Sequence, residues 1–160
     1  MIDQLGTIEG RTVVIERHLD APPDRVWQAL VEPAGLAAWL APAEVDPRVG
    51  GRIVLRFQNS DYVMHGEIRE LRPPEALEYS WGGDEPDSFV RFELEPDGKG
   101  TRLTLTHTRL EDGELSGFSA GWHHHLELLA AHVSGGDAGW DSERYQALKA
   151  DYERLEGKER

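Results

Sequence analysis

The sequence predicts an α+β fold in which an antiparallel sheet of six strands packs against one long helix near the C-terminal end. Between residues 52 and 109, apolar side chains recur at every second position between short turns, which is typical of antiparallel strands with one buried face. Residues 116–134 instead carry an apolar face at helical spacing, formed by Trp122, Leu126, Leu129 and Val133. We therefore expect the sheet and this helix to cover each other.

The chain begins with a strand and two short helices. Residues 7–19 contain the run VVI among polar neighbours, and β-branched residues favour a strand. Residues 24–30 follow a Pro-Pro pair and carry an acid at their start, which indicates the first turn of a helix. Pro33 restarts the chain before a second short helix over residues 34–40.

Five further strands follow, joined by short turns. The turns are indicated by Asn-Ser, Pro-Pro and Pro-Asp-Gly sequences. Short connections of this kind join antiparallel neighbours, because parallel strands need a long crossover. The predicted strands are residues 52–57, 62–68, 77–81, 89–94 and 101–109.

A last helix is predicted over residues 140–156, after the two glycines that end the long helix. Asp141 or Ser142 is a plausible cap. The apolar stripe of this helix is narrow, so it either packs on its own domain or contributes to a homodimer. We expect a single domain over residues 1–160, with a core over 7–134 and this helix as an addition.

The composition restricts the partners. The 160 residues carry a net charge of −13, which argues against nucleic acid and anionic membranes, because both are bound through clustered Lys and Arg. The charge serves solubility or forms an acidic face for a basic protein. The chain has no cysteine, no signal-peptide pattern and no apolar run long enough to span a membrane, so we expect a cytoplasmic protein without disulfides.

Several separated stretches together resemble one known family. They are APPDRVWQAL, LAAWL, RVGGR, HGEIRELRPPEALEYSW, GTRLTLTH and a GW pair followed by Leu126 and Leu129, and they extend over residues 12–133. In order and spacing they are similar to the SRPBCC or START-like superfamily, in the branch of the C-terminal domain of the activator of the heat-shock protein ninety ATPase. The resemblance implies a link to the stress response.

The resemblance also implies a helix-grip fold, in which a curved antiparallel sheet wraps the long helix and leaves an elongated cavity. Residues that point inward by strand parity, or lie on one side of the helices, would line it. These candidate ligand-binding residues are Trp39, Phe57, Tyr62, Met64, Tyr79, Trp81, Phe92, Leu105, His107, Trp122, His125, Leu126 and Leu129. The alternative is that large side chains fill this space.

His107 is the candidate polar group of the cavity, unless it is a core histidine satisfied by a hydroxyl or backbone partner. The run His123, His124, His125 does not predict a metal site, because consecutive helical residues point about 100° apart. The sequence GFSAG fits the spacing of a serine-hydrolase elbow but lacks the buried strand before it. The sequence thus predicts no catalytic residue, metal or cofactor.

Three functions fit these residues. The first is a small-molecule binding protein that holds a hydrophobic or aromatic ligand between the sheet and the long helix. The second is a co-chaperone-like or regulatory protein-interaction domain, as the resemblance and the acidic surface suggest. The third is a cyclase- or aromatase-like enzyme that uses His107, Tyr62 and Tyr79 in the same cavity. The sequence favours binding over catalysis.

Overall fold

The computed structural model describes residues 4–82 and 88–159. The chain begins with β1 (Thr7–Glu9), β2 (Thr12–Leu19), α1 (Pro23–Val31) and α2 (Pro33–Trp39). It continues with β3 (Ala43–Val45), β4 (Arg52–Arg56), β5 (Val63–Arg72), β6 (Ala76–Trp81), β7 (Ser88–Asp97) and β8 (Gly100–Thr108). It ends with the 3-10 turn η1 (Asp112–Glu114) and the helices α3 (Leu115–Val133) and α4 (Ser142–Glu159). This order confirms the predicted α+β class and the extra C-terminal helix.

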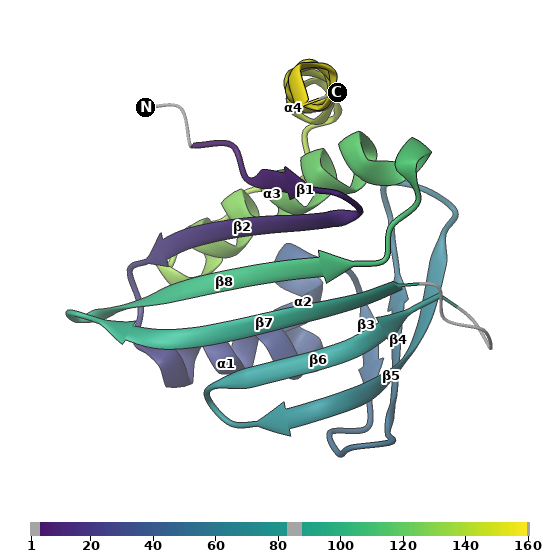
Figure 1. The fold of residues 1–160 in the computed structure, drawn as a ribbon. Helices are drawn as coiled ribbons and strands as arrows, with labels where there is room; N and C mark the ends of the chain where they lie inside the picture. Colours follow the sequence, from purple (N-terminus) through teal and green to yellow (C-terminus); the bar gives the residue numbers. More distant parts are fainter. Residues whose placement is uncertain (1–3, 83–87, 160) are drawn as a thin grey trace.

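The strands form one eight-stranded antiparallel sheet in the order β1-β2-β8-β7-β6-β5-β4-β3. The sheet curves around α3, which confirms the helix-grip arrangement (Figure 1). It has more strands than the predicted six for two local reasons. Gly10, with φ of 63°, allows a tight turn that divides the predicted strand over 7–19 into β1 and β2. β3 has only three residues, too few to show an alternating pattern.

Helix α3 presents its predicted apolar face to the sheet. Trp122, Leu126 and Leu129 are at most 3% exposed. They belong to one hydrophobic core that also includes inward side chains of β2, β4 to β8, α1 and α2. Burial of this face removes apolar surface from water, which stabilises the fold by about 25 cal/mol per Å².

Helix α2 is held against its neighbours by Trp39. Its indole Nε1–H donates to the Ala29 carbonyl oxygen of α1 at 2.7 Å. Its ring packs edge-on against Phe92 of β7, with ring centroids 6.3 Å apart. Trp39 is 2% exposed, so it fills space between α2 and the sheet.

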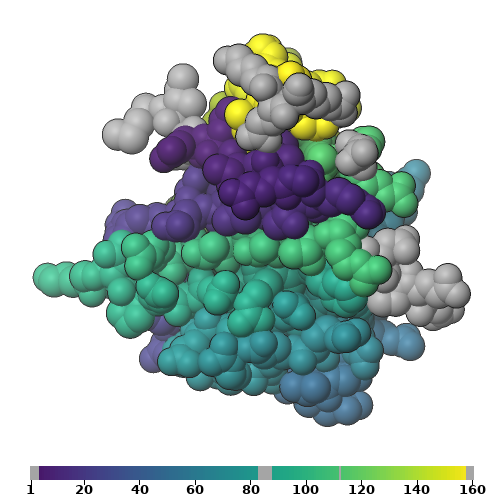
Figure 2. All heavy atoms as spheres, in the orientation of Figure 1, coloured from purple at the N-terminus to yellow at the C-terminus, as the bar shows by residue number. Residues whose placement is uncertain are grey.

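Helix α4 packs on α3 and lies beyond the β1 edge of the sheet (Figures 1 and 2). Asp141, one of the two predicted caps, accepts the backbone N–H groups of Glu143 and Arg144 at 3.0 and 3.2 Å. Tyr152 is fully buried, and its hydroxyl accepts the N–H of Gly6 at 2.8 Å. The helix is therefore fixed to its own chain at both its start and its centre.

Candidate functional site

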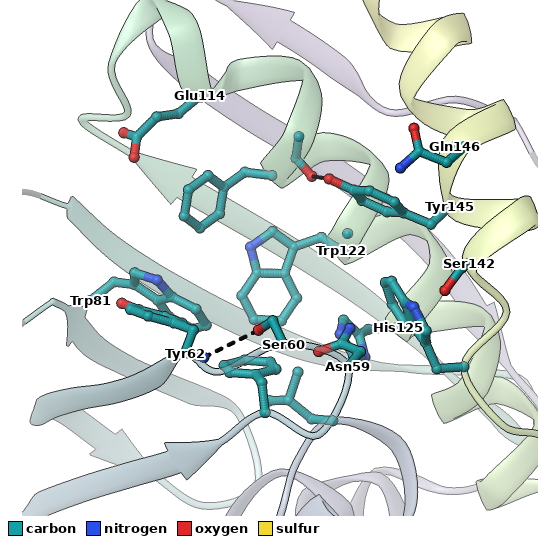
Figure 3. A pocket seen from close by; sticks show the side chains of 16 residues that line it. Asn59, Ser60, Tyr62, Trp81, Glu114, Trp122, His125, Ser142, Tyr145 and Gln146 are labelled. Atoms are coloured by element: carbon teal, nitrogen blue, oxygen red, sulfur yellow. Dashed lines mark hydrogen bonds between the residues drawn. The ribbon is translucent and has the colours of Figure 1, made fainter.

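A pocket of about 490 Å³ lies between the β4–β5 turn, the first half of α3 and the start of α4. It is lined mainly by aromatic rings, with polar groups at two ends (Figure 3). The lining residues are Leu40, Phe57, Asn59, Ser60, Tyr62, Trp81, Glu114, Gly117, Phe118, Gly121, Trp122, His125, Trp140, Ser142, Tyr145 and Gln146.

The pocket contains only part of the predicted lining. Phe57, Tyr62, Trp81, Trp122 and His125 surround it as predicted from strand parity and helix face. The other candidates are buried in the core away from the pocket, namely Trp39, Met64, Tyr79, Phe92, Leu105, His107, Leu126 and Leu129. The space between the middle of the sheet and α3 is therefore filled by side chains, and the pocket occupies one end of it.

His107 belongs to the filled part. The Trp122 indole N–H donates to His107 Nδ1 at 2.9 Å, so Nδ1 carries no proton and the neutral ring holds its proton on Nε2. Nε2 then donates to the Ser88 hydroxyl oxygen, also at 2.9 Å. Burial lowers the pKa of His107 to about 3. Both nitrogens are occupied, so His107 is a satisfied core histidine, which is the alternative to the predicted ligand or catalytic role.

His125 is the histidine that faces the pocket. Its Nδ1 lies 2.9 Å from the Trp39 carbonyl oxygen, and because a carbonyl only accepts, Nδ1 carries the proton. Burial is the main reason that the pKa of His125 falls to about 4, so the ring is neutral near pH 7. Nε2 has no hydrogen-bond partner among the described residues and is not sealed from solvent. It can accept a hydrogen bond from a ligand.

The opposite end of the pocket is formed by Trp81, Tyr62 and Glu114 (Figure 3). Trp81 is 7% exposed, and its indole N–H is sealed from solvent without an acceptor in good geometry among residues 4–82 and 88–159. Burial and then the negative charge of Glu114 raise the pKa of the Tyr62 hydroxyl, which keeps it protonated. This end therefore offers a ligand the neutral Tyr62 hydroxyl and the Glu114 carboxylate.

The other two histidines of the HHH run fix α4. His123 Nδ1 bonds the Tyr152 hydroxyl at 2.8 Å. Burial, and then the nearby Arg17 charge, lower the pKa of His123 to about 4. His124 Nε2 accepts the backbone N–H of Asp141 at 2.9 Å, which leaves Nδ1 to donate to Glu127. As the helix geometry predicts, the three rings point to different partners.

Glu127 connects this cluster to α4 through a second contact. Burial alone would raise the pKa of its carboxyl, but hydrogen bonds from Arg144 and His124 outweigh it and lower the pKa to about 2. The Arg144 Nη2 atom lies 2.6 Å from Glu127 Oε2. The carboxylate is thus charged at neutral pH and holds the beginning of α4 in place.

One wall of the pocket is formed by residues that come after the long helix in the sequence, and it was not predicted. Trp140, Ser142, Tyr145 and Gln146 come from α4 or the segment before it. Tyr145 lies over Gly121 of α3, where a Cβ atom would meet its Cε1 at 3.9 Å. The signal was present in the glycines of GFSAG, which leave room on α3 for an aromatic side chain of α4.

Among residues 4–82 and 88–159, no group of three or more His, Cys, Asp or Glu side chains is placed to hold a metal ion. In that same part of the chain, no helix is long and apolar enough to cross a membrane. The sequence between the predicted strands 77–81 and 89–94 carries the acidic residues Asp84, Glu85 and Asp87, whose pattern predicts solvated charges and which lie outside the described residues.

Known proteins resemble the chain in sequence and in fold. Residues 20–134 match the family model described as activator of Hsp90 ATPase homolog 1-like protein. No curated protein matches the chain. The family match runs from just before α1 to the end of α3, and it leaves out β1, β2 and α4.

Solved structures extend the likeness beyond the family match. The protein encoded by gene BPP1335 from Bordetella parapertussis is 30% identical, covers 94% of this chain and 90% of its own, and has a TM-score of 0.75. CalU16 from Micromonospora echinospora is 28% identical over 91% of this chain and 88% of its own, with the same TM-score of 0.75. The Aha1 dimer from Colwellia psychrerythraea, 20% identical, covers 79% of this chain and 98% of its own with a TM-score of 0.70, and shows the shared fold alone. Because the family model matches most of the chain and the fold is shared, the chain belongs to the family of activator of Hsp90 ATPase homolog 1-like proteins.

Proposed function

We propose that the protein binds a hydrophobic small molecule with an aromatic ring in the pocket between the β4–β5 turn, α3 and α4. The observation that carries this proposal is a cavity of about 490 Å³ whose walls are mostly aromatic rings. Pockets of this size and lining suit drug-sized ligands, which gain most of their affinity from burial of apolar surface.

The geometry of the rings supports a flat ligand. Phe57 and Tyr62 are stacked with ring centroids 5.9 Å apart, on the wall that the β4–β5 turn forms. The Trp81 ring meets the Trp122 ring edge-on, with centroids 5.3 Å apart. The Phe118 ring also lies edge-on to Trp81, at a centroid distance of 6.0 Å. Aromatic pairs of this kind add about 0.5–1.5 kcal/mol beyond area burial, so an inserted ring gains from each wall it touches.

The polar ends give orientation. His125 Nε2 is an acceptor at one end, and the Tyr62 hydroxyl and the Glu114 carboxylate lie at the other. A hydrogen bond at either end would fix the direction in which a ligand lies in the pocket.

The test is a fluorescence titration with the neutral probe Nile red, followed by displacement with 2-(1-naphthyl)ethanol. We expect one saturable site that the naphthalene compound empties. Denaturing mass spectrometry of the purified protein would identify any natural ligand that co-purifies. Absence of a saturable Nile red site would contradict the proposal.

Catalysis in the same pocket stays an alternative, with a different base from the one predicted. His125 has an accessible nitrogen, whereas both nitrogens of His107 are occupied and Tyr79 is 1% exposed in the core. Loss of turnover in His125→Asn, with Nile red binding retained, would support an enzyme over a binding protein.

A homodimer or protein partner also stays a hypothesis, supported by the family and by the net charge of −13. Light scattering after size exclusion, at low and at high salt, measures the mass of the particle in solution. A monomer mass at both salt concentrations would contradict the homodimer.

A further inference from the structure

The charge of the pocket lining has one sign. Among residues 4–82 and 88–159, the side chains that line the pocket include one carboxylate, that of Glu114, and no Lys or Arg. His125 adds no positive charge, because burial keeps its ring neutral. An anionic ligand would therefore lose its hydration in the pocket without gaining a cationic partner.

Glu114 has an oxygen available to a ligand. Its Oε1 accepts the backbone N–H of Glu111 at 3.1 Å as part of a capping box, so the carboxylate is held at the start of α3. Its Oε2 has no hydrogen-bond donor among the described residues. The carboxylate lies at the end of the pocket where Tyr62 and Trp81 lie (Figure 3).

The rings at this end suit a cation. Trp81 and Phe118 meet edge to face with centroids 6.0 Å apart, and Tyr62 stacks on Phe57 beside them. The faces of Trp, Tyr and Phe rings carry negative quadrupole charge and attract an ammonium group, with Trp the strongest of the three. The Glu114 charge also disfavours ionisation of the Tyr62 hydroxyl, which indicates a negative potential there.

We propose that the pocket selects aromatic ligands that carry a protonated amine, with the ring between Trp122 and Tyr145 and the ammonium group beside Glu114. This inference rests on the proposed function, since it names the class of ligand that the same pocket binds. It also assigns Glu114 as the residue that determines specificity. The neutral end at His125 is left for a hydrogen-bond donor on the ring.

The experiment compares three compounds of one shape, 2-(1-naphthyl)ethylamine, 2-(1-naphthyl)ethanol and 1-naphthylacetate, by isothermal titration calorimetry at pH 7.5. We expect the amine to bind about fivefold or more tighter than the alcohol, and the carboxylate to bind weakest. The advantage of the amine should fall as salt is raised, because Glu114 lies at the exposed end of the pocket.

Two variants of equal net charge show whether the preference for the amine comes from the pocket or from the acidic surface as a whole. Glu114→Gln keeps an oxygen for the Glu111 N–H and should bring the amine and the alcohol to within about twofold of each other. Glu32→Gln removes a charge from the exposed junction of α1 and α2, outside the pocket, and should leave the preference unchanged.

The outcomes distinguish this inference from the function on which it rests. If the carboxylate binds as tightly as the amine, or if Glu114→Gln leaves the preference unchanged, the inference is wrong and the proposed function stands. If none of the three compounds binds, both are wrong.

Discussion

The imidazole of His125 donates from Nδ1 to the backbone oxygen of Trp39 at 2.9 Å, and this contact ties α3 to α2. It also decides which nitrogen faces the pocket, because the proton on Nδ1 leaves the lone pair on Nε2. The ring of Trp140 lies 4.7 Å away and covers its other side. One histidine thus serves the fold through one nitrogen and the pocket through the other.

Two amide substitutions separate these roles of His125. Asparagine places its amide N–H near the position of Nδ1, whereas glutamine reaches toward the position of Nε2. We expect His125→Gln to leave the Trp39 carbonyl without its donor and to lower the free energy of unfolding by about 1–3 kcal/mol. His125→Asn should lose less stability but bind 1-naphthol, which has its hydroxyl on the ring, about two- to tenfold more weakly. The methyl ether 1-methoxynaphthalene, which has no hydroxyl to donate, is the control, and an equal loss for the ether would contradict the hydrogen bond to Nε2.

The Trp122 indole makes a buried hydrogen bond to His107 at 2.9 Å. Trp122→Phe removes this donor and leaves Nδ1 unpaired, so the free energy of unfolding in urea should fall by about 1–3 kcal/mol, with a further loss from the smaller ring. Trp140→Phe is the matched control, because the Trp140 indole N–H has no acceptor among the described residues. Equal losses in the two variants would contradict the role given to the Trp122–His107 bond.

Gly121 lines the pocket without filling it. A Cβ atom there would meet Tyr145 Cε1 at 3.9 Å, an ordinary contact, so Gly121→Ala fits and should stabilise α3 by about 0.5–1 kcal/mol. Gly121→Leu extends into the cavity and should abolish saturable Nile red binding while the far-ultraviolet circular dichroism stays native. Nile red bound equally well by both variants would place the probe elsewhere.

Acid should destabilise the protein before its carboxylates titrate. The pKa values of His107, His123 and His125 are lowered to between about 3 and about 4, so below pH 6.5 the unfolded chain binds protons that the folded chain does not. Their contribution to stability is complete above pH 6.5 and is lost as the pH falls toward 4, by about 1.4 kcal/mol per pH unit for each histidine.

Urea unfolding at a series of pH values between 7.5 and 4.5 measures this slope. His123→Gln should reduce the slope of unfolding free energy against pH by about 1.4 kcal/mol per pH unit, which is the contribution of one histidine. His65→Gln is the control, because His65 is exposed on β5 and should leave the slope unchanged. A stability that is flat over this pH range would contradict the neutral state of the buried rings.

Strand parity predicted most of the fold because inward positions are set by local pattern alone. Leu105 and His107 point inward as predicted and are 0% exposed. Parity cannot say whether an inward side chain meets a void or another side chain, which is why both were predicted to line a cavity. The answer depends on Trp39 and Trp122, which approach from helices distant in sequence and fill that space.

The role of α4 could not be predicted for a related reason. Its heptad-like apolar residues suited either its own domain or a dimer. Hydrogen bonds of Tyr152 with Gly6 and His123 determine which face of α4 packs on the rest of the domain. Both partners lie far from Tyr152 along the chain. Once that face is buried, Tyr145 reaches Gly121 and completes the pocket.

The most direct test of the proposed binding site follows the indole N–H signals of the 5 tryptophans in a ¹H–¹⁵N correlation spectrum during titration with 2-(1-naphthyl)ethanol. We expect saturable shifts for Trp81, Trp122 and Trp140, which line the pocket. The signals of Trp27 and Trp39, which lie in the core outside it, should stay in place. Unchanged spectra at saturating compound, or shifts confined to Trp27 and Trp39, would contradict the account.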